Sequence, residues 1–103
     1  MELRGKQKSF LKSQAHHLRP IFQIGKNGLN EEMIVQINEA LEKRELIKVS
    51  LLQNTDEIAA DVADVLSKKI NCQTIQIIGR TLVLFKESAK EKNRKISTTV
   101  KNL

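Results

Sequence analysis

Two glycines enclose a lysine and an asparagine in the segment Gly25-Lys26-Asn27-Gly28, and residues of these types at this spacing can bind a phosphate group. Glycine has no Cβ, so it lets another backbone approach closely and readily adopts positive φ. A helix is predicted to begin shortly after Gly28, and the free N–H groups at a helix N-terminus attract anions. The chain has a formal net charge of +6. We therefore expect the phosphate groups that bind to this segment to be those of a nucleic acid.

Positive charge is concentrated at the two ends of the chain. Residues 1–28 contain six Lys or Arg and one acidic residue, and residues 86–103 contain six Lys or Arg and two acidic residues. Residues 29–85 contain nine acidic residues and six basic ones. This asymmetry predicts an oriented surface for a polyanion. Two solvated basic termini would give the same composition and remain an alternative.

Catalytic and metal sites find little support in the sequence. His16 and His17 are adjacent, so they point in different directions on a helix, and no cysteine or carboxylate lies near them at the spacing of a zinc site. Cys72 has no histidine or other base near it in the sequence. No paired carboxylates or nucleophile–base arrangement stands out. We therefore expect a protein that is not an enzyme and that uses no metal, cofactor or small-molecule substrate.

The chain has the size of one globular domain. Its 103 residues are 40% hydrophobic, which is enough for a single core. No apolar run approaches the roughly 18 residues of a membrane-spanning helix, and the N-terminus has no apolar signal region. The lone cysteine cannot form an internal disulfide. We expect a cytoplasmic monomer that makes no membrane contact.

Periodicity and turn residues predict the elements of the first half of the chain. A helix over residues 4–18 ends before Pro20, which cannot continue it. A short strand follows over residues 20–25. A second helix begins after an N-cap at Asn30 and runs to about Arg44.

The second half of the chain supplies three more strands and a third helix. Apolar and polar side chains alternate over residues 46–52, which predicts a sheet with one face left in water. Residues 54–57 (Asn-Thr-Asp-Glu) resemble a capping box for the third helix. Strands over residues 73–78 and 81–86 are joined by Gly79-Arg80, which suits a type II′ hairpin turn.

This order, α-β-α-β-α-β-β, predicts an α/β fold with a mixed four-stranded sheet packed against three helices as a two-layer sandwich. The two β-α-β crossovers should be parallel and the last strand pair antiparallel. The domain is expected to span residues 1–87. Residues 88–103 contain few apolar side chains, so they are expected to form a basic tail, either a frayed helix or a mobile segment.

A basic face on the first helix is predicted to lie beside the glycine loop. Lys8, Lys12, His16 and Arg19 share one side of that helix. If the helix packs antiparallel to the strand that follows, its start comes close to the loop. About 13 helical residues and five strand residues cover similar lengths, roughly 20 and 17 Å. The helix and the loop would then form one basic track.

The Gly-x-x-Gly pattern alone leaves two interpretations open. KH domains use a similar loop to clamp a nucleic-acid backbone, but the same pattern also makes a tight β-to-α turn. Glu31 and Glu32 lie in the first turn of the next helix and would repel a phosphate placed too deep. The only aromatic residues are three phenylalanines. We therefore expect phosphate, sugar and shape contacts at the rim of the loop, without base stacking.

Four ordered blocks together resemble the signature of the CRM domain, a family named for chloroplast RNA splicing and ribosome maturation. The similarity is greatest to the stand-alone bacterial YhbY-like members and covers about residues 3–87. Phe85 stands where many members carry tyrosine. The blocks are residues 18–20 (Leu-Arg-Pro), 24–29 (Ile-Gly-Lys-Asn-Gly-Leu), 45–49 (Glu-Leu-Ile-Lys-Val) and 78–85 (Ile-Gly-Arg-Thr-Leu-Val-Leu-Phe).

This resemblance implies an RNA-binding domain related in architecture to the C-terminal domain of initiation factor three. It also implies a role in ribosome assembly through rRNA in precursors of the large subunit. The family's loop corresponds to Gly25, Lys26, Asn27 and Gly28, and its basic first helix to the Lys8–Arg19 face. A protein-binding adaptor, which would reach the ribosome through the acidic middle of the chain, remains the alternative.

Overall fold

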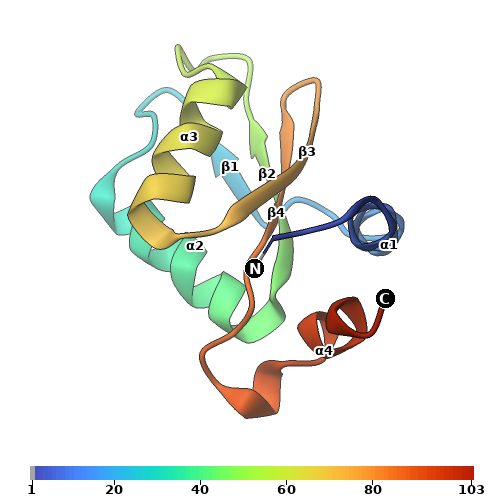
Figure 1. The fold of residues 1–103 in the computed structure, drawn as a ribbon. Helices are drawn as coiled ribbons and strands as arrows, with labels where there is room; N and C mark the ends of the chain where they lie inside the picture. The colour runs from blue at the N-terminus through green and yellow to red at the C-terminus, as the bar shows by residue number, and fades with distance from the viewer. Residues whose placement is uncertain (1) are drawn as a thin grey trace.

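A computed structural model of the protein describes residues 2–103, and Figure 1 shows its fold. The elements in chain order are α1 (Gly5–Ala15), β1 (Phe22–Ile24), α2 (Glu31–Arg44), β2 (Leu46–Leu51), α3 (Ala59–Ile70), β3 (Gln73–Ile78), β4 (Thr81–Phe85), the 3₁₀ helix η1 (Glu91–Asn93) and α4 (Ile96–Lys101). The predicted order of the first seven elements is therefore confirmed. Within residues 2–103, no helix has the length and apolar character needed to cross a membrane.

The strands form one mixed sheet in the order β1-β2-β4-β3. β1 is parallel to β2, and β4 is antiparallel to both β2 and β3. The predicted hairpin is confirmed, since Ile78 pairs with Thr81 across two residues and Gly79 has a φ of +57°. The α/β fold with a mixed four-stranded sheet is likewise confirmed.

α2 and α3 cover one face of the sheet. α2 begins where predicted, because the Asn30 side chain accepts a hydrogen bond of 2.8 Å from the Met33 N–H and so satisfies a free donor of the first turn. Ile37 and Leu41 of α2 are fully buried, as is Leu66 of α3. Each such side chain contributes roughly 1.5–3 kcal/mol by leaving water, so this core fixes both helices against the sheet.

The start of α3 differs from the sequence prediction. Residues 54–57 do not form a capping box. The N-cap is Ile58, which makes no side-chain cap hydrogen bond. Thr55 Oγ1 accepts from the Glu57 N–H at 3.2 Å, and the Glu57 carboxylate turns toward residue 29 instead of back along its own helix.

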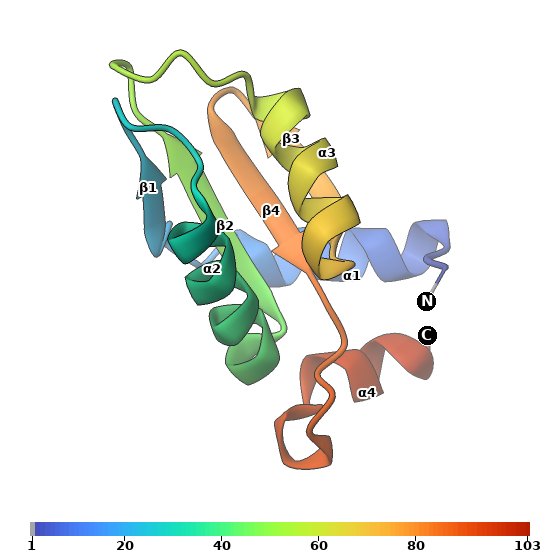
Figure 2. The same ribbon diagram turned by 90° about the vertical axis from the view of Figure 1, so that its left-hand side faces the viewer.

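α1 and α4 lie on the other face of the sheet, as Figures 1 and 2 show. Their core contains Leu11 of α1, Val83 and Phe85 of β4, and Val100 of α4. The sheet therefore has helices on both faces and not on one as predicted, and the face that was expected to lie in water is only partly exposed. The reason is β4, which is apolar on both faces: Leu82 and Leu84 pack toward α2 and α3, while Val83 and Phe85 pack toward α1.

Residues 88–103 pack against the domain and are not a frayed or mobile tail. The Glu45 carboxyl group is fully buried and accepts hydrogen bonds from the N–H groups of Ser88 (2.8 Å) and Ser97 (3.0 Å) and from the Ser97 hydroxyl. The Gln7 side-chain amide of α1 donates to the Val100 carbonyl at 2.9 Å. This packing could not be predicted from composition, because the segment is attached mainly through hydrogen bonds of buried polar groups and through few apolar side chains. The domain boundary at residue 87 stays a prediction.

Candidate functional site

The Gly25–Gly28 loop is a closed turn between β1 and α2. The Ile24 carbonyl is held by the Leu52 N–H at 2.8 Å, which fixes the end of β1. The Gly28 N–H donates to the Gly25 carbonyl at 3.0 Å, and Gly28 has a φ of +68°, a conformation that glycine adopts without strain. Lys26 and Asn27 are exposed at the tip. The turn therefore presents a cation and an amide to solvent on a defined backbone.

A side chain of the protein already binds the backbone N–H group that lies just before the N-cap of α2. The Leu29 N–H donates to Glu57 Oε2 at 2.8 Å. A Cβ added to Gly28 would lie 3.2 Å from the same oxygen, so the glycine also makes room for this carboxylate. Sequence reasoning missed this role of Glu57, because 28 residues separate the two partners and no motif links them.

Beside the loop lies a pocket of about 250 Å³, lined by residues 26–29 and 55–57. Asp56 and Glu57 make one wall acidic, and Lys26 is the basic residue of the lining. A phosphate inside this pocket would meet two carboxylates. The electrostatics therefore favour an anion on the outer side of the loop, next to Lys26, over one in the pocket.

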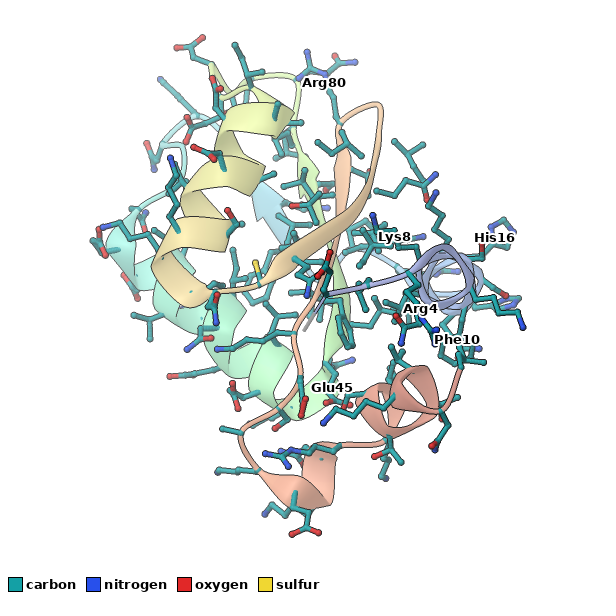
Figure 3. The ribbon with its side chains drawn as sticks, in the orientation of Figure 1. Arg4, Lys8, Phe10, His16, Glu45 and Arg80 are labelled. Atoms are coloured by element: carbon teal, nitrogen blue, oxygen red, sulfur yellow. The ribbon has the colours of Figure 1, made fainter. Side chains whose placement is uncertain are left out.

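α1 does not run beside β1, and the predicted single basic track is wrong. The helix crosses the sheet on the face opposite α2 and α3, and Figure 2 shows it passing behind the strands. Its start is bonded to the C-terminal segment: Gln7 donates to the Val100 carbonyl, and the Arg4 guanidinium donates to the Leu103 carbonyl. The packing of Phe10 against the same core, visible in Figure 3 between α1 and α4, fits this position.

The basic residues that were predicted for the first helix consequently lie apart from the glycine loop. Lys8, Lys12 and His16 are exposed along the helix, and Figure 3 shows Lys8 and His16 leaving it in different directions. Arg19 lines a pocket of about 230 Å³ with Arg44 and Leu46. Leu46 begins β2, whereas the glycine loop lies beside the end of β2. Arg19 and the loop are therefore at opposite ends of the strands.

Two further basic side chains, those of Arg80 and Lys48, donate hydrogen bonds to backbone carbonyls near the predicted site residues. Arg80 Nη1 donates to the Leu52 carbonyl at 3.0 Å, which places the guanidinium at the sheet edge that holds the glycine loop. Lys48 Nζ donates to the Leu18 carbonyl at 3.0 Å, just past α1. The sequence assigned Arg80 only to a turn and Lys48 only to a polar alternation, so neither was predicted as a site residue.

The described residues offer no arrangement for catalysis by the cysteine. Burial raises the pKa of the Cys72 thiol to about 11, so the thiol stays protonated and unreactive at neutral pH. Among residues 2–103, no group of three or more His, Cys, Asp or Glu side chains is placed to hold a metal ion.

The sequence that contains α1, the glycine loop and the strands matches the model of a known family. The family model of the CRS1 / YhbY (CRM) domain matches residues 3–86. The chain belongs to the CRM family. The matched region of this CRM domain contains α1, the Gly25–Gly28 loop and all strands of the sheet described above, and it ends before η1 and α4.

Relatives of this CRM domain are found in several bacteria. The Bacillus subtilis protein named "Probable RNA-binding protein YqeI" is 61% identical over 90 residues, which are 87% of this chain and 94% of that one. An RNA-binding protein of Haemophilus influenzae is 38% identical over 87 residues, covering 84% of this chain and 88% of its own. The solution structure of SAV1595 from Staphylococcus aureus, a protein proposed to bind RNA, has a TM-score of 0.72 and 47% identity, and the match covers 91% of this chain and 98% of that one.

Proposed function

We propose that this CRM domain binds structured RNA without catalysing a reaction, and that its target is rRNA in precursors of the large ribosomal subunit, whose assembly it assists. The observation that carries RNA binding is the exposed Lys26 at the tip of a closed glycine turn, in a family whose relatives are named RNA-binding proteins. The rRNA target is supported by the resemblance of the four sequence blocks to the ribosome-maturation members.

Lys26 contacts a backbone phosphate from the outer side of the loop. Gly25 and Gly28 let the RNA backbone come close, because neither carries a Cβ. The Asn27 amide at the tip adds a neutral hydrogen-bond donor. The Leu29 N–H is already bonded to Glu57, so it is not available to the phosphate.

The basic face of α1 forms a second contact zone. Lys8, Lys12 and His16 attract phosphates along the helix, and Arg19 extends the attraction to the other end of the strands. Phe85 is buried and the other two phenylalanines are partly buried, so stacking on bases contributes little. Recognition then depends on phosphates, riboses and the shape of the RNA. The protein acts as a cytoplasmic monomer in this proposal.

This function is tested by reversing the charge of the loop and comparing the result with a control variant that has the same charge change elsewhere. Lys26→Asp with Asn27→Asp lowers affinity for a transcript of large-subunit rRNA by about tenfold or more, and it lowers the slope of log K against log salt by about one phosphate's share. The control is Lys101→Asp with Asn102→Asp, which makes the identical charge change at the end of α4. Equal weakening by both variants would show that net charge, and not the loop, governs binding.

The cellular target is tested by crosslinking followed by sequencing of the attached RNA. Reads from large-subunit precursors are expected from the wild type and are expected to be depleted for the loop variant. One observation favours the adaptor alternative: Val35 is 54% exposed on α2, among the acidic residues of that helix. Partners that survive nuclease treatment in a pull-down, together with an unchanged loop variant, would support an adaptor instead.

A further inference from the structure

One row of side chains crosses the sheet beside α1. The strand register pairs Gln23 of β1 with Ser50 of β2, and Ser50 with Thr81 of β4. Thr81 pairs in turn with Ile78 of β3. Residues that oppose each other in neighbouring strands share a face of the sheet. These four side chains, the sheet row, therefore form one line across all four strands, roughly 14 Å long at about 4.8 Å per strand.

The sheet row lies on the α1 face and is not covered by the helix. Leu82 packs toward α2 and α3 and Val83 toward α1. Thr81, two residues before Val83, shares its face because side chains alternate along a strand. Gln23 is exposed and Ile78 is 53% exposed. Ser50 and Thr81, in the middle of the row, are partly exposed. α1 thus covers the part of this face around Val83 and leaves the row at least partly accessible to solvent.

The elements that form and flank the sheet row carry basic side chains and no acidic ones. Neither α1 nor any strand described within residues 2–103 contains an aspartate or a glutamate. The nine acidic residues of positions 29–85 lie in α2 and its C-cap, in α3 and in the segment just before α3. On the α1 face, Lys48 of β2 lies two residues before Ser50, and Arg80 of the hairpin directly precedes Thr81. α1, which packs on the same face, carries the exposed Lys8 and Lys12. Figure 3 shows Lys8 beside α1 and Arg80 at the β3–β4 hairpin.

We propose that the sheet row is a further RNA-contact surface, which takes the ribose–phosphate backbone between the glycine loop and α1. This inference rests on the RNA binding proposed above and adds a surface to it. The row begins two residues before Gly25 and ends next to Arg80, so it joins the two contact zones that α1 and the loop leave separate.

The side chains of the row suit a ribose–phosphate partner. The Gln23 amide and the hydroxyl groups of Ser50 and Thr81 can bond ribose 2′-hydroxyls and phosphate oxygens. Ile78 offers apolar surface to the sugar carbons. A protein partner with an acidic surface would be attracted by the same charges, and a nuclease-resistant complex at this face would count against the proposal.

Two neighbouring isoleucines supply a matched test. Ile78 lies in the row, whereas Ile77 pairs with Leu82 and faces the other side, where it is 42% exposed. Ile78→Glu is expected to lower affinity for a transcript of large-subunit rRNA by about tenfold, because a carboxylate then faces phosphate. Ile77→Glu changes the affinity by less than about twofold. Ile78→Lys is expected to raise it, which keeps the test decisive if the glutamate variant folds poorly.

A measurement of salt dependence completes the experiment. Arg80→Ala should lower the slope of log K against log salt by about 0.7–0.9 if the guanidinium contacts one phosphate. Equal effects of Ile78→Glu and Ile77→Glu, or no effect of Ile78→Lys, would overturn the sheet row as a contact surface. If the wild-type protein does not bind the transcript, the proposed function fails. If the loop variant weakens binding while the Ile78 variants do not change it, only this inference fails.

Discussion

Glu45 and Glu57 each bind a backbone N–H of a distant segment, yet their surroundings are opposite. The Glu45 carboxyl group is fully buried and receives hydrogen bonds from Ser88 and Ser97. Glu57 is half-buried, makes one such bond to the Leu29 N–H at 2.8 Å, and lines a pocket of about 250 Å³. The same kind of hydrogen bond thus holds the segment of η1 and α4 against the domain through Glu45, whereas through Glu57 it makes a contact that solvent can reach.

Burial explains why the two contacts differ in consequence. If Glu45 is removed, its donors have no water to replace the carboxyl group, and each stranded donor costs about 1–3 kcal/mol. If Glu57 is removed, water or an incoming anion can take its place on the Leu29 N–H. We therefore expect substitutions of Glu45 to change the free energy of unfolding and substitutions of Glu57 to change the affinity for RNA.

The largest effect is expected from Glu45→Ala. The variant leaves three donors without their acceptor, namely the Ser88 and Ser97 N–H groups and the Ser97 hydroxyl. At about 1–3 kcal/mol for each donor, the free energy of unfolding should fall by at least about 3 kcal/mol. Urea denaturation measures the loss. Glu45→Gly is the matched control, because Glu45 has a φ of +66°. Glycine relieves about 1 kcal/mol of strain at that angle without restoring the carboxyl group. A Glu45→Ala variant as stable as the wild type would remove the distinction between the two carboxylates.

Gly28→Ala should have the next largest effect on stability. A Cβ at a φ of +68° costs roughly 1–2 kcal/mol, and it would press on Glu57 Oε2 at 3.2 Å. The expected results are a lower melting temperature and an altered amide signal for Leu29. Gly5→Ala is the control, since a Cβ there meets nothing within 4 Å and alanine favours the helix. Two variants of equal stability would argue against the strained loop.

A smaller effect is expected from Glu57 on RNA affinity. Glu57→Ala frees the Leu29 N–H and removes a negative charge, so affinity should rise by about two- to fivefold, in line with the 0.2–1 kcal/mol of an exposed charge pair. Glu57→Gln should give a smaller rise, because its amide oxygen can keep the hydrogen bond. Asp56→Asn removes the same charge from the same pocket without touching the loop and serves as the control. Weaker binding by Glu57→Ala would instead identify the carboxylate as a support that the loop needs.

The smallest expected effect is a pH dependence of the stability of residues 88–103, the segment that Glu45 binds. Burial raises the pKa of Glu42, but hydrogen bonds from the Ala89 N–H and Lys86 outweigh it and lower the pKa below 4.5. The Lys101 ammonium, 2.6 Å away, lowers the pKa of Glu87 as well. Both carboxylates therefore stabilise the fold above about pH 4.5, and this contribution is lost as the pH falls further.

Hydrogen exchange of the α4 amides between pH 6 and pH 3 measures this loss. Earlier opening of α4 than of α2 is the expected result. Glu87→Gln, which removes one of the two groups, should flatten the dependence. If α4 and α2 open together in both proteins, the C-terminal segment is no less stable than the rest of the domain.

The sequence predicted those features whose causes are local. Asn30 could be recognised as an N-cap, and Gly79-Arg80 as a hairpin, because the signal lies within a few residues of the structure it makes. The position of α1 could not be predicted in the same way, since it depends on Val83 and Phe85, some 70 residues away, making the second face of β4 apolar. The family resemblance correctly identified the domain but carried no information on which sheet face α1 covers.

The site shows the same division between local and distant causes. The closed turn at Gly25–Gly28 follows from its own glycines. The carboxylate that accepts a hydrogen bond from the Leu29 N–H, just before α2, is that of Glu57. No residue near Leu29 in the sequence indicates this contact. Glu45 is similar, because neither its positive φ nor its two serine partners can be inferred from the residues beside it.

The central place of β4 has a consequence for the synthesis of the protein. β2 and β3 do not pair with each other, since β4 lies between them. A nascent chain that ends before Thr81 therefore contains two unconnected sheet fragments and exposes the edges where β4 will insert. The line from Gln23 through Ser50 to Ile78 does not exist until Thr81 joins it. The surface beside α1 is thus completed only when β4 has been made, so unfinished chains cannot present it.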